Sequence, residues 1–264
     1  MPPFGVLHIP HSATAIPAEV IPSLLVSDDV LRGELFAMTD WYTDELFALP
    51  AAEAVPVRFP ISRLVLDPER FLDDSQEVMS SRGMGVIYTR THDGQVLRDA
   101  PTAAERQALI ERYYVPHHAA LTQAVRLALE EHRQCLVVDC HSFSALPQPC
   151  GLDQSPDRPD ICVGTDPFHT PAWLTSLAVK LFDGHRLSVE VDRPYSGALV
   201  PTDYYQHNAS VAAIMVELNR RLYMDESTGE KSAGFVAVAE MTRGVVGELV
   251  DSCRVRRKGL EGLG

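Results

Sequence analysis

The stretch Cys135-Leu-Val-Val-Asp-Cys140, followed at once by His141 and Ser142, decides the fold. A short and nearly unbroken apolar run is typical of a central strand that is buried on both faces of a sheet. Working outward from it, similar short apolar runs alternate along the chain with longer stretches of helical character. This alternation predicts an α/β fold.

The predicted strands cover residues 4–9, 55–59, 86–89, 135–140, 161–163, 187–191 and 211–218. The predicted helices cover residues 27–49, 102–131, 171–182 and 233–250. Ser27 is a suitable N-cap, and Thr102 with Glu105 forms a capping box. Pro116 should kink or split the helix that contains it. Residues 146–159 are rich in Pro, Asp and Gln, so we expect a loop there.

Composition and charge narrow the class of protein. The chain is 45% hydrophobic and 22% charged, and no repeat or linker divides it, so we expect residues 1–264 to form one domain. A net charge of −13 argues against binding to nucleic acid or to an anionic membrane. No apolar run approaches the ~20 residues of a membrane span. The five cysteines include no Cys-x-x-Cys pair, which argues against a disulfide framework and favours the cytoplasm.

Two histidines follow predicted strands at the places where an α/β protein positions its site. His11 comes just after the first strand, and His141 comes just after the strand at residues 135–140. Because ligands bind beyond the carboxyl ends of the strands, we expect these side chains to meet. Two imidazoles with one carboxylate form the usual catalytic zinc set. The alternative is that both are ordinary surface or core residues, and His8, inside its strand, is interpreted as structural.

Acidic side chains complete this hypothesis. Asp40 and Asp44 are four residues apart in a predicted helix and should share one face, which is either a solvated acidic face or a source of a metal ligand. Glu217 lies in the apolar run 212–218, where an ionised side chain is costly unless it is paired or functional. It is interpreted either as a general base beside a metal or as the ion-pair partner of a following arginine.

Three arginines are candidates for binding a substrate carboxylate. Arg63 and Arg70 flank residues 64–69, and Arg193 opens the segment Arg193-Pro-Tyr-Ser-Gly197. The guanidinium group suits bidentate carboxylate recognition, although each could equally be a surface charge. The sequence contains no dinucleotide fingerprint, phosphate-binding loop or Gly-x-Ser-x-Gly elbow, which argues against nucleotide-binding and serine-hydrolase functions.

A series of short motifs follows in order over residues 5–226. They are Pro10-His-Ser12, Thr39-Asp-Trp41 with Asp44-Glu-Leu46, Ser62-Arg-Leu-Val-Leu-Asp-Pro-Glu-Arg70, Pro116-His-His118, Asp139-Cys-His-Ser142, Arg158-Pro-Asp160 with Val163-Gly-Thr165, Arg193-Pro-Tyr-Ser-Gly197 and Val216-Glu-Leu-Asn-Arg-Arg-Leu-Tyr-Met-Asp225. Each motif is weak alone, but their order and spacing resemble the N-formylglutamate amidohydrolase family.

The resemblance implies a relative of the zinc carboxypeptidases. The implied fold is a three-layer α/β/α sandwich with a mixed, mostly parallel sheet, and the implied cofactor is one zinc ion. His11, Asp40 and His141 would be the metal ligands, with Asp44 as the alternative carboxylate. Glu217 would match the glutamate that acts on the metal-bound water.

The resemblance implies that Arg70 holds a substrate carboxylate, and a mechanistic hypothesis built on it adds two further arginines. Arg70, together with Arg193, would hold the carboxylates of a substrate, and Arg63 would stabilise the oxyanion. One position departs from the family, which usually has Asn where this chain has Glu69. A carboxylate there would repel an acidic substrate unless it points away from the pocket.

The implied reaction is the zinc-dependent hydrolysis of an N-acyl amino acid, such as N-formylglutamate, to a carboxylic acid and the free amino acid. This is the activity of a deformylase in histidine degradation. The expected partner is therefore a small acylated amino acid, and self-association stays open. The alternatives are a zinc deacylase or carboxypeptidase with another substrate, a metal- or ligand-binding protein without catalysis, and a structural domain.

Overall fold

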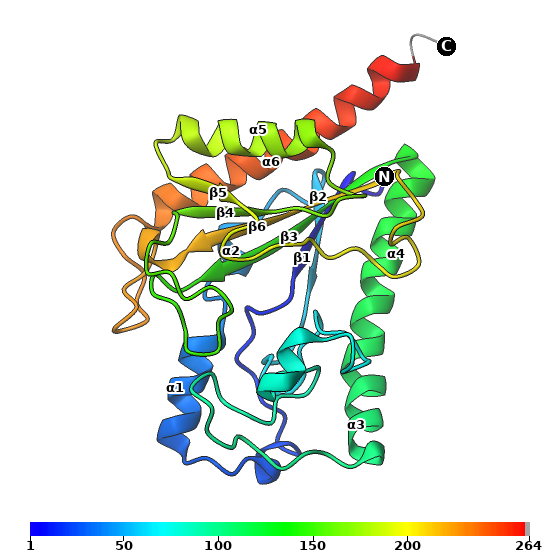
Figure 1. Ribbon diagram of the computed structural model, residues 1–264. Helices are drawn as coiled ribbons and strands as arrows, with labels where there is room; N and C mark the ends of the chain where they lie inside the picture. The colour runs from blue at the N-terminus through cyan, green and yellow to red at the C-terminus, as the bar shows by residue number, and fades with distance from the viewer. Residues whose placement is uncertain (262–264) are drawn as a thin grey trace.

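The structure is a computed structural model that describes residues 1–261, with side chains described as far as residue 256. Six strands form one sheet in the order β2-β1-β3-β6-β4-β5 (Figure 1). They are β1 (Gly5–Ile9), β2 (Ala54–Arg58), β3 (Cys135–Phe143), β4 (Ile161–Gly164), β5 (Val189–Val191) and β6 (Val211–Asn219). The first four in the spatial order are parallel, whereas β4 runs antiparallel to β6 and parallel to β5. The predicted α/β fold with a mixed, mostly parallel sheet is confirmed.

Helices cover both faces of this sheet. They are α1 (Asp28–Met38), α2 (Thr43–Leu46), α3 (Ala103–Leu109), α4 (Val115–His132), α5 (Ala172–Gly184) and α6 (Phe235–Glu261). Short turns are the 3₁₀ segments η1 (Ile21–Ser23), η2 (Val78–Arg82) and η4 (Arg220–Leu222) and the π-helical turn η3 (Ile110–Tyr114). Figure 1 shows α5 and α6 together on one face and α4 on the other. Among the described helices, none is long and apolar enough to cross a membrane.

The packing of the core explains why the sequence of β3 is a nearly continuous apolar run. Side chains alternate between the two faces of a strand. Leu136 and Val138 pack in the cluster shared with α5 and α6, whereas Cys135 and Val137 pack in the cluster shared with α4. Both faces of β3 are therefore buried, as the sequence predicted.

The predicted helix over residues 27–49 is wrong beyond Met38, where α1 ends. The next residue is extended, and the Asp40 N–H donates to the His11 carbonyl oxygen at 3.0 Å. Only the four-residue helix α2 follows. Because pairing with the segment after β1 replaces the helical hydrogen bond, Asp40 and Asp44 do not share a helix face, contrary to the prediction.

Three other predicted boundaries have clear outcomes. The strand expected at residues 86–89 is wrong, since this segment makes only an isolated antiparallel bridge between Met84 and Tyr88. The helix expected at residues 102–131 is split into α3 and α4 by η3, directly before the proline that was expected to interrupt it. Helix α6 runs past its predicted end, because neither Gly nor Pro interrupts residues 251–258.

The chain segments after β1 and β2 lie beyond the carboxyl ends of the parallel strands (Figure 1). Two satellite apolar clusters hold them in place, one around Phe59 and Val65 and the other around Leu64, Met79 and Tyr88. These segments cover the edge of the sheet where an α/β protein places its site.

Candidate functional site

The sheet register gathers polar side chains at the carboxyl ends of three neighbouring strands. His8 on β1 lies opposite Asp139 on β3, and His141 on β3 lies opposite Glu217 on β6. Because side chains alternate, Asp139 and His141 point to the same face as Val137, which is the face covered by α4. All four polar side chains are buried.

The structure brings His11 and His141 together, as expected. Their ring centroids are 5.1 Å apart. Asp40 Oδ2 lies 3.6 Å from His11 Nδ1 and 3.0 Å from His141 Nδ1. Asp44 instead forms an ion pair with Arg58 at 2.9 Å and does not line the same cavity. The broken helix therefore presents Asp40, and not Asp44, to the two histidines.

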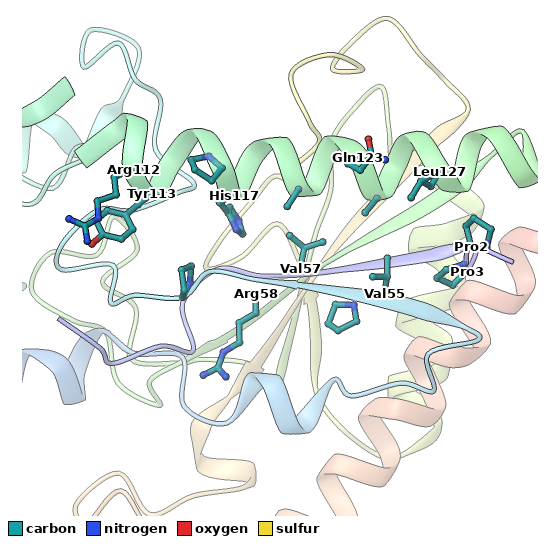
Figure 2. A pocket seen from close by; sticks show the side chains of 15 residues that line it. Pro2, Pro3, Val55, Val57, Arg58, Arg112, Tyr113, His117, Gln123 and Leu127 are labelled. Carbon is teal, nitrogen blue, oxygen red and sulfur yellow. The ribbon is translucent and has the colours of Figure 1, made fainter. Parts of the chain in front are cut away.

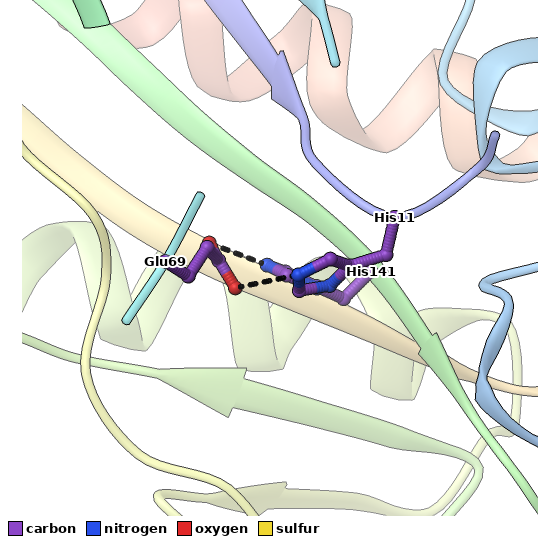
Figure 3. A group of neighbouring side chains, drawn as sticks. All are labelled: His11, Glu69 and His141. Atoms are coloured by element: carbon purple, nitrogen blue, oxygen red, sulfur yellow. Dashed lines mark hydrogen bonds and ion pairs between the residues drawn. The ribbon is translucent and has the colours of Figure 1, made fainter. Parts of the chain in front are cut away.

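Glu69 also reaches the two histidines (Figure 3), a contact that the sequence analysis did not predict. Its Oε1 lies 3.1 Å from His141 Nε2, and its Oε2 lies 3.7 Å from His11 Nε2. His11, Glu69 and His141 are close enough to hold a metal ion, and so are His8, Glu69 and Asp139. Asp40 and Glu69 are thus two candidate carboxylate ligands for the same pair of histidines.

The contacts of the outer ring nitrogens of the two histidines favour Asp40 over Glu69 as the carboxylate ligand of the metal. Asp67 Oδ1 lies 2.9 Å from His11 Nε2, and Asp139 Oδ1 lies 3.1 Å from His141 Nε2. Metal-binding histidines commonly donate their second ring N–H to a carboxylate, which leaves the other nitrogen for the metal. Within the described side chains, His11 Nδ1 is buried without a hydrogen-bond partner. A divalent metal held by the two Nδ1 atoms and Asp40 would satisfy this nitrogen, so the donor set fits a zinc ion.

Electrostatics keeps Asp40 ionised. Burial by itself would raise the pKa of its carboxyl, but the neighbouring imidazoles of His11 and His141 outweigh burial and hold the pKa well below its ordinary value. Burial acts to lower the pKa of His141, whereas the carboxylates of Glu69 and Asp139 outweigh it and raise the pKa. Metal binding requires neutral imidazoles, so a bound cation would replace these protons.

Glu217 is also a buried acid, but its pKa is shifted in the opposite direction to that of Asp40. Burial raises the pKa of its carboxyl to about 8; His141 opposes this rise and Asp40 adds to it. Its Oε2 has no hydrogen-bond partner among the described side chains. The expected alternative, an ion pair with a following arginine, is not observed in residues 1–256, since Arg220 donates to the Thr39 carbonyl oxygen at 2.6 Å. A carboxyl group in this state can exchange a proton near neutral pH.

The cluster opens into a cavity of about 350 Å³, a size that suits a small molecule. Arg63 and Arg70 both line it. Arg63 Nη2 donates to Asp67 at 2.7 Å, and its Nε donates to the Tyr88 hydroxyl at 3.1 Å. The guanidinium of Arg70 makes no hydrogen bond to the described residues, and its nearest carboxylate, Asp67, is 3.5 Å away. Arg70 is therefore the more available cation.

The structure does not bring Arg193 into this cavity. Its guanidinium lies 2.5 Å from Glu190 and 3.2 Å from Asp153. The residues that follow it, Pro194 to Ser196, do line the cavity, so the motif contributes through its loop.

A second cavity, of about 660 Å³, lies between β2 and α4 (Figure 2). Its lining is mostly apolar and includes Val55, Val57 and Leu127, but no acidic residue or cysteine. His117 links this cavity to the site, with its Nε2 2.9 Å from His8 Nε2. Of these two cavities, the smaller one therefore holds the cluster of histidine and carboxylate side chains.

Sequence reasoning missed the residues that support the histidines. Asp139 interrupts an apolar strand just as Glu217 does, and the same signal could have found it. Asp67 lies within the motif of residues 62–70, but its contact with His11 joins chain segments 56 residues apart, which no local pattern indicates. Glu69 was recognised as a departure, but its direction was left open.

Together, the mixed sheet and the buried histidine–carboxylate cluster define an α/β/α protein with a hydrolytic type of site. The model of the N-formylglutamate amidohydrolase family matches residues 5–224. The chain belongs to this family and is a hydrolase of the amidohydrolase type.

Solved structures agree with this assignment. The crystal structure of N-formylglutamate amidohydrolase from Ralstonia eutropha JMP134 is similar with a TM-score of 0.82 and 25% identity, covering 95% of this chain and 94% of that one. A gene product from Agrobacterium tumefaciens shares the fold, with a TM-score of 0.70 and 20% identity over 97% of this chain and 92% of that one. No curated protein matches the chain in sequence.

Proposed function

We propose that residues 1–264 act as one catalytic domain that holds a single zinc ion and hydrolyses N-acyl amino acids, with N-formyl compounds such as N-formylglutamate as first candidates. The observation that carries the proposal is the buried, unpartnered Nδ1 of His11 beside Asp40 and His141, with the unpartnered Oε2 of Glu217 in the same cavity. Membership of the family supports the reaction class. A small-molecule partner also agrees with the net charge of −13, which disfavours nucleic acid and anionic membranes.

His11, Asp40 and His141 would hold the zinc ion, which supplies Lewis-acid activation of water and of the scissile carbonyl group when bound. Asp67 and Asp139 orient the two imidazoles through the outer nitrogens. Such support fixes the tautomer of each ring and increases its basicity as a ligand.

Glu217 moves the proton in this proposal. As a base it accepts the proton of the attacking water, and as an acid it delivers that proton to the leaving amine. A pKa raised to about 8 by burial suits a group that must take up and release a proton in turn. General acid–base groups of this kind contribute about 10²- to 10⁴-fold to the rate.

Two arginines would orient the substrate. Arg63 is fixed by Asp67 and Tyr88 at the cavity wall, where it would stabilise the oxyanion that develops on the carbonyl. Arg70, with its available guanidinium, would bind the substrate's α-carboxylate. Arg193 enters the proposal only through the loop that it opens, because its guanidinium is already paired.

Release of formate from N-formyl amino acids, measured before and after chelation, tests the proposal. We expect activity to vanish with the metal and to return with zinc. Asp40→Asn should lower zinc affinity and kcat/KM by at least about 100-fold, since removing a ligand exceeds the 10–100-fold effect of removing a supporting carboxylate. Asp44→Asn is the matched control, because Asp44 pairs with Arg58 outside the cavity. Full activity after verified loss of the metal would contradict the role of zinc.

A further inference from the structure

Outside the proposed catalytic groups, the 350 Å³ cavity has an apolar wall beside polar lining residues such as Ser144, Gln148 and Ser196. Four of the chain's seven methionines line it, and they are Met38, Met79, Met84 and Met215. The first three are buried and belong to one apolar cluster. The exposed side chain of Val78 extends this lining. Methionine side chains adapt to the shape of an apolar group, so this wall can bury an aliphatic substituent of a substrate.

The cationic groups of the cavity can hold one carboxylate and leave no free counter-ion for a second. Arg63 is paired with Asp67 and is assigned to the reacting carbonyl. Arg220 is 4% exposed and donates to two backbone carbonyl oxygens at 3.1 and 2.6 Å. Only Arg70 keeps a guanidinium that is free of hydrogen bonds to the described part of the chain, and its ion pairs with Asp67 at 3.5 Å and Glu77 at 3.8 Å are longer than that of Arg63. The guanidinium of Arg70 is therefore assigned to bind the α-carboxylate that every amino acid substrate carries.

Glu69 makes a second substrate carboxylate still less favourable. Its side chain is 17% exposed and lies at the cavity with one oxygen 3.1 Å from His141. Glu217 contributes another acidic group to the same lining. A γ-carboxylate placed here would lose water and meet carboxylates without a cation to pair with, which is costly.

We infer that the amino acid released by this enzyme has an uncharged, apolar side chain, which lies against Met38, Met79 and Met84 while its single carboxylate binds Arg70. The inference rests on the proposed amidohydrolase function, and within that function it replaces N-formylglutamate as the first candidate substrate. The preferred substrates are N-acyl derivatives of aliphatic amino acids, rather than of dicarboxylic ones.

The test compares three N-formyl amino acids whose side chains have similar length: norleucine, glutamine and glutamate. With the zinc-loaded full chain, we expect kcat/KM for N-formylnorleucine to exceed that for N-formylglutamate by at least about tenfold, because pocket mismatches of this kind discriminate by about 10-fold or more. N-formylglutamine, which is polar but uncharged, should fall between them.

Variants of the wall link this preference to the named residues. Met79→Lys supplies the missing cation and should shift the norleucine-to-glutamate ratio of kcat/KM toward glutamate by at least about tenfold. Met79→Leu, which keeps the wall apolar, should leave the order unchanged. Since Met79 is buried and its lysine variant risks misfolding, Val78→Lys at the exposed mouth serves as the second variant and should shift the ratio in the same direction.

The outcomes separate the two proposals. If the wild-type protein hydrolyses N-formylglutamate as well as or better than N-formylnorleucine, the inference is overturned and the proposed function stands. If both lysine variants fold and leave the ratio unchanged, the methionine wall does not bind the side chain and the inference is likewise overturned. If no N-acyl amino acid is hydrolysed at all, the proposed function fails and the inference falls with it.

Discussion

Replacing Glu217 by Gln removes a buried carboxyl group while keeping its shape. In the wild-type protein this side chain is 6% exposed, its Oε2 has no partner among the described residues, and burial raises its pKa to about 8 from an ordinary value of 4.5. The folded protein therefore binds the Glu217 proton more tightly than the unfolded chain does. By linkage, the contribution of this group to the free energy of unfolding is greatest at low pH and falls as pH rises from about 4.5 to about 8.

The size of this effect follows from the two pKa values. One pH unit corresponds to about 1.4 kcal/mol, so a fully ionised Glu217 would destabilise the metal-free protein by up to about 5 kcal/mol above pH 8. Glutamine cannot ionise, so Glu217→Gln should gain a large fraction of that amount relative to wild type at pH 8.5, and much less at pH 4.5. In the zinc-loaded enzyme, the same variant should lose at least about 10²-fold in kcat because it cannot accept a proton.

Urea unfolding in the presence of a chelator, at pH values between 4.5 and 8.5, measures the stability difference between variant and wild type. The kcat and the zinc content are measured on the same preparations with metal. A stability difference that does not change with pH would refute the raised pKa. A near-normal kcat in a variant that binds zinc normally would remove Glu217 from the mechanism.

Three further changes test the site and its support. Asp67→Asn, which weakens the hold on His11 Nε2, should lower zinc affinity by about 10–100-fold in competition with a chelator, and unchanged affinity would contradict the orienting role. Arg70→Ala should raise KM for N-acyl amino acids far more than for an N-acyl amine without a carboxylate; an equal loss for both would assign Arg70 to structure. Gly164→Ala should lower the free energy of unfolding by about 1–3 kcal/mol, because an added Cβ would lie 2.4 Å from the Gly197 carbonyl oxygen. Gly244→Ala, with nothing within 4 Å in the middle of α6, should not destabilise, and equal unfolding midpoints for the two variants would contradict this steric argument.

Features that depend on the local pattern of residues could be predicted from the sequence. The apolar run of β3 identified a strand buried on both faces, and the strand ends placed His11 and His141 at one edge of the sheet. The end of α1 was not predictable in this way. The helix ends because Asp40 donates its N–H to His11, and this contact between distant segments overrides the local helical preference.

The partners of charged side chains also depended on tertiary structure. Arg193 belongs to a motif of the family, yet Glu190 and Asp153 hold its guanidinium away from the cavity. Glu69 was noticed as an unusual residue, but only the packing of its segment against β1 and β3 turns it toward His141. A pattern of residue types can nominate such groups, whereas their direction is set by contacts that no local pattern records.

The central claim is that one zinc ion is held by His11, Asp40 and His141. Anomalous diffraction at the zinc edge, on crystals of the full chain with its metal content measured, tests it most directly. We predict one zinc ion per chain, bonded at about 2.0–2.2 Å to the Nδ1 atoms of both histidines and to an oxygen of Asp40, with Glu69 unbonded. A protein that stays free of metal at saturating zinc, or an ion bound by the Nε2 atoms and Glu69, would contradict the account.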